Sequence, residues 1–230
     1  MALGTALSDA VTVSTTAGVH NISLNSDGIA AVNAAIGSGV FTVCLMGYHI
    51  DYLNNAPVQD GDHTQISVSY MENFSIANRP TLSLDFDGTV LSVSPENSGN
   101  DDDAFLNKYD LTGSVAWDDI RGDISTSSNL RRPNSPSYTL GVYSRIYTGR
   151  GGVIKQNVRS VFAFDLSSII PAVIAVTLNL YLDNLGHTND DFGKVIVVQS
   201  TALEGTTADY GNCFVADAVT DNAVFFGANF

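Results

Sequence analysis

Positively charged residues are scarce in this sequence of 230 residues. Ten lysines and arginines stand against 24 aspartates and glutamates, so the formal net charge is -14. The first basic residue is Arg79, and most of the others gather between Arg121 and Arg159. A chain with so few cations has little with which to neutralise phosphates, which argues against a nucleic-acid partner. The acidic first half could meet the more basic middle within or between subunits, or it could simply be a solvated surface.

Cysteine is also rare. Cys44 and Cys213 are the only two, and one pair in a chain of this length is not a disulfide scaffold. Cys44 lies in an apolar run typical of a buried strand, so two buried thiols are one interpretation. A single bridge between the two residues is the other.

Long apolar runs are absent as well. No stretch approaches the roughly 18 apolar residues of a membrane span, and residues 1–6 lack the basic and apolar regions of a secretory signal. Only 15% of the residues are charged, against about 25% in a typical soluble domain. Thr, Ser, Asn and Gly take their place, as they do in many extracellular and virion β-proteins. We therefore expect a virion or extracellular location without a membrane partner, reached through cell lysis or from a trimmed precursor.

Short apolar segments separated by glycine, asparagine and aspartate turns dominate what is present. The expected strands are Val11–Thr15, Val19–Leu24, Phe41–Gly47, Gln65–Met71, Thr81–Asp87, Val90–Val93, Tyr138–Thr148, Val153–Leu166, Val173–Leu182 and Lys194–Val198. Many short strands with such turns predict an all-β fold, specifically a jelly-roll-like β-sandwich.

One short helix is predicted between the second and third of these strands. Ile29, Val32 and Ile36 have helical spacing, Ser26 or Asp27 can cap the start, and Gly37 can end the helix. Such a helix would cover the open end of a sandwich and bury its apolar stripe there.

A polar, acidic stretch that begins at Pro95 interrupts the strand pattern and has no capacity to form a core. The chain therefore divides into residues 1–94, a linker at 95–137 with one further candidate strand at Leu111–Trp117, and residues 138–230.

Residues Val158–Pro171 and Val176–Leu182 carry a family resemblance. They read as a basic residue, an apolar stretch, Phe-Asp, a Ser-Ser-Ile turn and an alternating strand. This pattern resembles the opening half of DNRLRE-type β-sandwich modules, which are related to certain carbohydrate-binding modules. Such modules occur in bacterial surface proteins and in phage structural proteins. Val19–Leu24, Phe41–Leu45 and Arg79–Leu84 resemble the closing half of the same modules.

The two halves stand in the opposite order from that of the family. They could be permuted within one chain, exchanged between neighbouring copies, or cut from a longer repeat array. Exchange would cover the apolar segment that ends the sequence, through strand pairing with a neighbouring copy. The residues expected to be seated in that neighbour are Val224, Phe225, Phe226 and Phe230.

Acidic pairs provide candidate ligands for Ca²⁺, which is common as a structural ion in modules of the resembling family. Asp85 and Asp87 are predicted to share the outer face of a strand, and Asp101 and Asp103 lie in the acidic linker. A solvated turn is the alternative interpretation for each pair. No cofactor is required by any motif in the sequence.

The remaining motifs are weak. Arg121-Gly122-Asp123 matches the integrin-binding tripeptide, which recurs by chance. No catalytic triad order, zinc-binding helix motif or phosphate loop is present, and no pair of carboxylates is singled out for glycoside hydrolysis. Trp117, Tyr143 and Tyr147 could form a sugar-stacking platform, although aromatic residues on strands more often pack in a core.

The sequence therefore predicts a non-enzymatic structural protein of a bacteriophage virion, such as a capsid decoration, tail or fibre component. Its expected partners are copies of itself and other virion proteins. The alternative is a carbohydrate-binding or adhesion module of a cell-surface or tail-fibre protein, with a glycan as its partner.

Overall fold

The computed structural model describes residues 5–37, 39–69, 75–95, 103–122, 128–131, 141–184 and 190–200. The strands are β1 (Val11–Thr12), β2 (Gly18–Ser23), β3 (Val40–Gly47), β4 (Thr64–Val68), β5 (Thr81–Asp85), β6 (Val90–Val93), β7 (Asp103–Asp110), β8 (Ser128–Arg131), β9 (Val142–Gly149), β10 (Gly152–Asp165), β11 (Ala175–Asn184) and β12 (Lys194–Gln199). The helices are α1 (Ser26–Ala35), α2 (Trp117–Gly122), the π-helix η1 (Tyr48–Tyr52) and the 3-10 turns η2 (Ile76–Asn78) and η3 (Asp190–Gly193).

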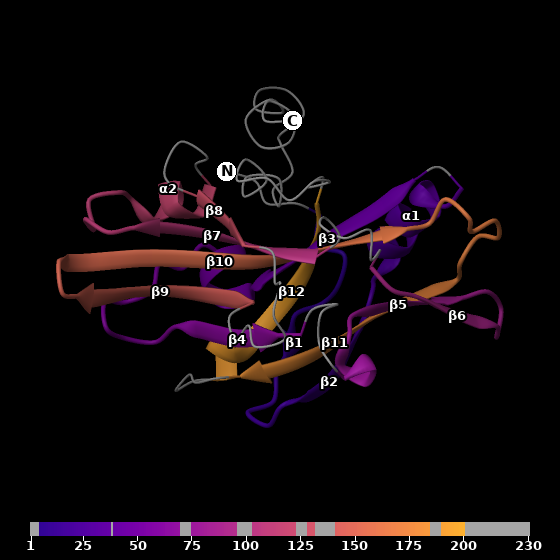
Figure 1. Cartoon of the computed structure of the whole chain (residues 1–230), viewed down its shortest axis with the longest axis horizontal. Helices are drawn as coiled ribbons and strands as arrows, with labels where there is room; N and C mark the ends of the chain where they lie inside the picture. Colours follow the sequence, from indigo (N-terminus) through magenta and orange to yellow (C-terminus); the bar gives the residue numbers. More distant parts are fainter. Residues whose placement is uncertain are drawn as a thin grey trace.

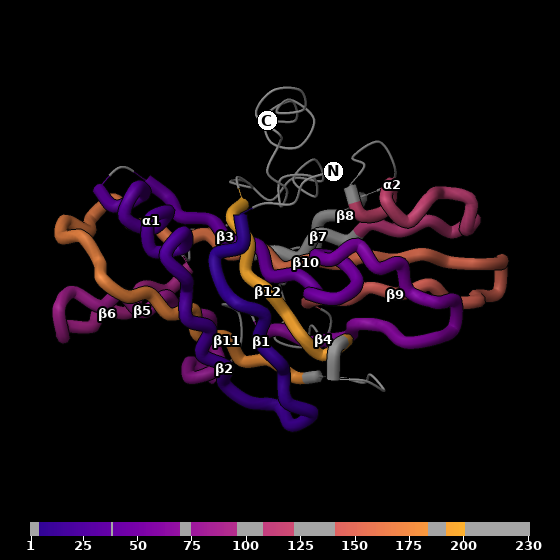
Figure 2. The backbone as a smooth tube through the Cα atoms, turned by 180° about the vertical axis from the view of Figure 1, so that it is seen from behind, coloured from indigo at the N-terminus to yellow at the C-terminus, as the bar shows by residue number. Residues whose placement is uncertain are grey.

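The strands join into one large antiparallel sheet that folds over on itself (Figures 1 and 2). One layer contains β1, β12, β3, β10, β7 and β8, the other contains β2, β11, β5 and β6, and β9 and β4 connect the two. This is the all-β, sandwich-like fold with a short helix that the strand pattern predicts.

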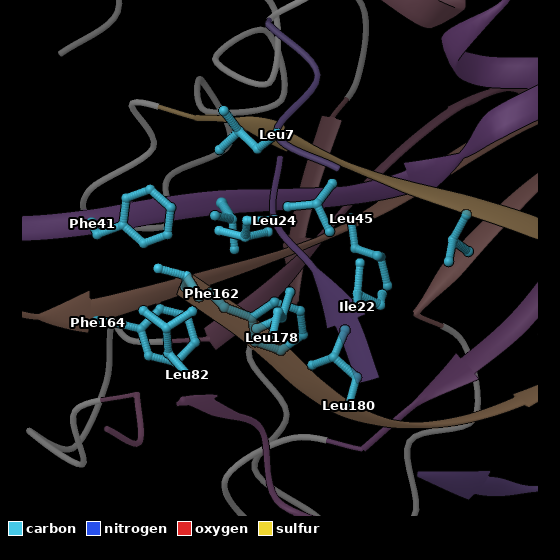
Figure 3. Close-up of a cluster of buried hydrophobic side chains, with 14 of the residues drawn as sticks. Leu7, Ile22, Leu24, Phe41, Leu45, Leu82, Phe162, Phe164, Leu178 and Leu180 are labelled. Atoms are coloured by element: carbon cyan, nitrogen blue, oxygen red, sulfur yellow. The ribbon is translucent and has the colours of Figure 1, made fainter. Parts of the chain in front are cut away.

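The core lies between the two layers because the strands alternate. Phe162 and Phe164 on β10 face Leu178 and Leu180 on β11, and all four side chains are fully buried (Figure 3). Burying a large apolar side chain stabilises the fold by about 1.5–3 kcal/mol. The core is therefore shared by strands that lie far apart in the sequence.

The two predicted halves are interleaved in this sheet rather than lying side by side. β3 pairs with β10 through Phe41 opposite Phe164, and β11 lies between β2 and β5. Among the described strands of residues 1–94, only β5 and β6 pair with each other. Residues 1–94 and the described part of residues 138–230 therefore build one sheet together within a single copy.

Helix α1 forms as predicted, but its cap differs. Val32 is buried, and Ile29 and Ile36 pack against the core, so the helix lies at one end of the molecule against β3 and β11 (Figure 1). The cap is Asn25 rather than Ser26 or Asp27, because the Asn25 side-chain oxygen accepts hydrogen bonds from the N–H groups of Asp27 and Gly28 at 3.0 Å.

The segment predicted as a linker contains regular structure. β7 and β8 lie within it, and the candidate strand Leu111–Trp117 is instead a series of bends that leads into α2. Asp110 causes this change, because its carboxylate accepts hydrogen bonds from the N–H groups of Thr112 and Val115 and so turns the chain. Most other predicted strands are present with shifted ends.

Among the described residues, the structure contains no helix that is both long and apolar enough to cross a membrane.

Candidate functional site

The charged residues that the structure buries gather on the face of β10 that points away from the core. Along β10, Val158, Phe162 and Phe164 point into the core, so Asn157 and Arg159 point to the opposite side. Helix α2 and η1 pack over this side. We call the resulting cluster the buried polar face. Its members are Asp51, Lys108, Asp110, Arg121, Ser144, Asn157 and Arg159.

Asp51 and Arg159 form the centre of the buried polar face. Both side chains are 0% exposed. The Arg159 Nε donates to Asp51 Oδ2 at 2.6 Å, and its Nη2 donates to Asp51 Oδ1 at 2.7 Å. This two-point contact is the strongest geometry available to an arginine and a carboxylate.

Arg121 links this ion pair to α2. The Arg159 Nη2 also donates to the Arg121 carbonyl at 2.6 Å, and the Arg121 Nη1 donates to the Asp51 carbonyl at 3.3 Å. The three residues come from η1, α2 and β10 and tie these elements together. Arg121 is almost completely buried, so its guanidinium is not presented as part of an exposed Arg-Gly-Asp motif. Asp123 lies outside the described residues.

The local backbone turns the Asp51 side chain into the interior. η1 is a π-helix directly after β3, and it buries both Ile50 and Asp51. Ile50 packs with Trp117 and Ile120 of α2 in a small apolar cluster. Single-turn π-helices are rare and are frequently found at functional sites.

A second row of polar side chains crosses the buried polar face beside the ion pair. In register, Ser144 of β9 lies opposite Asn157 of β10, and Asn157 lies opposite Lys108 of β7. All three side chains are fully buried. The Ser144 hydroxyl donates to the Asn157 Oδ1 at 2.5 Å.

The next row along the face contains Asp110 and Lys155, which are also opposite each other. Burial favours the neutral form of Asp110, but hydrogen bonds from Thr112 and Val115 outweigh it and lower the pKa of Asp110. The Lys155 Nζ donates to the Val115 carbonyl. The Asp110 carboxylate is therefore held ionised close to the Ser144–Asn157–Lys108 row.

A second polar site lies on the other face of β9. The Arg145 guanidinium carbon lies 3.7 Å from the centre of the Tyr147 ring and 4.4 Å from that of Tyr143. His63 meets the Tyr143 ring edge-on. Tyr147 remains partly exposed, so the stack of Arg145 and Tyr147 can be reached from solvent.

The three residues predicted as a sugar platform are not brought together on the surface. Trp117, the first residue of α2, is 7% exposed and packs against Ile50, and Tyr143 is 1% exposed and belongs to the core. Rings buried in this way present no face to a sugar. Tyr147 alone of the three is partly exposed, beside Arg145.

Of the predicted Ca²⁺ ligands, Asp85 and Asp87 lie in different local structures. Asp85 ends β5, where its Oδ1 accepts the Gly88 N–H at 2.8 Å, whereas Asp87 lies in the turn with a φ of 60°. Asp103 begins β7, and Asp101 lies outside the described residues. Over the described part of the chain, the structure contains no group of three or more His, Cys, Asp or Glu side chains arranged to hold a metal ion.

The residues predicted to mediate assembly lie outside the described residues. These are Val224, Phe225, Phe226 and Phe230. The described surface does contain an exposed strand edge at β6, which pairs only with β5 in the described sheet. On β6, Val90 is 62% exposed and Leu91 is 43% exposed.

Sequence reasoning missed the Asp51–Arg159 pair. The two residues are 108 positions apart, and no local pattern connects them. A signal was nevertheless present, because Arg159 is the one charge in the apolar stretch Val158–Phe164, and a charge that is buried needs a partner.

Comparisons with known proteins identify no relative. No protein-family model matches the chain, and neither a curated protein nor a solved structure matches it.

Proposed function

We propose that this chain is a non-enzymatic structural protein of a bacteriophage virion that assembles through strand pairing between its copies. The observation that carries the proposal is the exposed edge of β6. Sheet edges in soluble proteins are usually protected by charges, proline or a covering segment. Residues Val90–Val93 contain neither charge nor proline, so this edge can accept another strand.

The strand that we propose for this edge is the segment 223–230 of a neighbouring copy. It contains Val224, Phe225, Phe226 and Phe230 and has no charged residue. Strand addition supplies backbone hydrogen bonds, while alternate apolar side chains provide specificity. Such an arrangement is heterologous and repeats from copy to copy, forming a ring or a filament. Either assembly fits a capsid decoration, tail or fibre component.

Strand addition is favoured over the exchange of whole halves. β2, β3 and β5 already pair with β10, β11 and β12 of the same chain. Exchange of halves would break these ladders before re-forming them, whereas addition at β6 breaks none.

Deletion of residues 223–230 should convert the assembled protein into a monomer, because the added strand is then lost. Val90→Lys should have the same effect, because it places a charge at the receiving edge. Light scattering over a dilution series measures the mass in each case. Val58→Lys is the matched control, since Val58 is 74% exposed and lies in a loop that is hydrogen-bonded to β9 and, within the described residues, not to β6. A Val90→Lys protein with the full assembled mass would contradict pairing at β6.

The second candidate function is glycan binding at the stack of Arg145 and Tyr147. A partly exposed tyrosine beside planar polar groups suits the stacking of a sugar ring, and Gln156 extends the polar surface through a contact with Arg145 at 3.5 Å. Tyr147→Ala should abolish retention on a glycan array if this is the site. An array that stays blank with folded wild-type protein would exclude it.

A further inference from the structure

Lys108 and Asn157 lie directly opposite each other on two neighbouring antiparallel strands. Lys108 belongs to β7 and Asn157 to β10. Directly opposite residues share one face of a sheet, with Cβ atoms about 4.5–5.5 Å apart. The four-carbon side chain of a lysine is long enough to carry its amine to the side-chain amide of such a neighbour.

Both side chains are completely excluded from solvent. The sequence has only three lysines, and Lys155 and Lys194 are each partly exposed, so Lys108 is the one that the fold buries fully. Removal from water disfavours the charged form of an amine. The neutral form is the nucleophile in reactions of lysine with carbonyl groups.

The amide of Asn157 is polarised for attack. The Ser144 hydroxyl donates a hydrogen bond to the Asn157 Oδ1 at 2.5 Å. A donor placed on a carbonyl oxygen inside a dry site stabilises the negative charge that develops there when a nucleophile adds to the carbon. Ser144, Asn157 and Lys108 thus form a row of oxygen donor, electrophile and nucleophile across three strands.

We propose that Lys108 and Asn157 join spontaneously in an intramolecular isopeptide bond. The lone pair of Lys108 Nζ attacks the Asn157 Cγ, and the bond between Cγ and Nδ2 then breaks. A proton lost by Nζ goes to the departing nitrogen, which leaves as ammonia. The reaction needs no oxidant, metal or cofactor, because one amide replaces another.

The ionised carboxylate of Asp110 lies in the next row of the buried polar face and can take up this proton before it passes to the departing nitrogen. Asp110 is two residues from Lys108 on the same face of β7, and Asp51 is held by Arg159, two residues from Asn157 on β10. The product would cross-link β7 to β10 beneath α2. Its formation depends on the fold of one copy and not on assembly or on the role proposed above.

The mass of the intact, denatured wild-type protein tests the proposal directly. We expect a mass lower than that of the unmodified chain by one molecule of ammonia. Trypsin should fail to cut after Lys108 and should release a branched product in which the peptide Gln156–Arg159 is attached to Lys108. A wild-type protein with the full mass of its sequence would overturn the proposal, as would an ammonia loss that maps to any other residue.

Variants test whether Lys108 and Asn157 are the two residues joined by the bond. Lys108→Met and Asn157→Ser should each show the full mass calculated for that variant, because one reacting group is missing. Lys194→Met is the matched control and should still lose one ammonia, since Lys194 lies on β12, away from the row. Loss of the mass deficit in Lys194→Met would overturn the assignment. The wild-type mass decides the question even if a variant of the buried row fails to fold.

Discussion

At the scale of single residues, Arg159 is the one charge in an otherwise uncharged stretch of β10, Val158–Phe164. Its guanidinium is satisfied by Asp51 on two sides and by the Arg121 carbonyl. Taking two charges out of water costs several kcal/mol per ion, so a buried pair is not in itself a source of stability. What it does supply is a fixed geometry, because its hydrogen bonds join η1, α2 and β10.

Asp51→Ala should lower the free energy of unfolding by about 3–5 kcal/mol, because it leaves the Arg159 charge buried without its carboxylate. Urea denaturation followed by fluorescence or circular dichroism measures this change. The double variant Asp51→Leu/Arg159→Met should recover most of the loss, since it removes both charges together. Asp9→Asn is the control, because Asp9 is exposed and should change stability little. Equal losses in the Asp51 and Asp9 variants would contradict a central role for the pair.

The sequence around Arg159 does not identify its partner. Arg159 is recognisable as a buried charge that needs a partner, but nothing near it in the sequence selects Asp51 among 24 acidic residues. The partner follows only from the π-helix after β3, which turns Asp51 inward while Tyr48 and Tyr52 stay partly exposed.

At the scale of elements, the loop between η1 and β4 is held against β9 by hydrogen bonds of Asp60. The Asp60 N–H donates to the Ile146 carbonyl at 2.9 Å. The Asp60 carboxylate in turn accepts the Thr148 N–H at 2.7 Å and the Thr148 hydroxyl at 2.6 Å. One aspartate thus holds the loop against the strand that carries Arg145 and Tyr147.

This attachment should weaken in acid. The hydrogen bonds from Thr148 lower the pKa of Asp60 below its ordinary value of 3.8. The contribution of Asp60 is therefore complete above that ordinary value and is lost as the pH falls through the lower, folded-state pKa. An NMR titration of the Thr148 amide should show a transition with its midpoint below 3.8, and Asp60→Asn should remove that transition. A midpoint at or above 3.8 would contradict this account.

Elements with a strong local pattern could be predicted from sequence, and those that depend on a distant contact could not. α1 was recognisable from the spacing of Ile29, Val32 and Ile36, because one face of a helix must meet the core. Its cap, predicted at Ser26 or Asp27, is Asn25, whose side chain also donates to the Ala6 carbonyl at 2.8 Å, and that contact cannot be read from the local sequence. Leu111–Trp117 looked like a strand, but the hydrogen bonds to Asp110 turn the chain there.

At the scale of the whole molecule, the sandwich-like fold was predictable because alternation sorts residues into an inner and an outer face. The pairing order was not, because antiparallel partners are chosen by the packing of a shared core. Leu178, for example, lies opposite Ile22 on one side and Leu82 on the other. The buried polar face could not be foreseen for the same reason, since it takes members from five different elements.

The interleaving of the two segments has a consequence for biosynthesis. When the ribosome has made residues 1–94, the partners of β2 and β3 on β10, β11 and β12 do not yet exist. The apolar strand Val40–Gly47 therefore stays unpaired until β10, which ends at Asp165, has emerged from the exit tunnel, and it gains its second partner only when β12 follows. Non-local pairing of this kind folds slowly and leaves hydrophobic strands open to aggregation. We therefore expect that slower translation between residue 94 and residue 199 makes the yield of native protein depend strongly on chaperones and temperature.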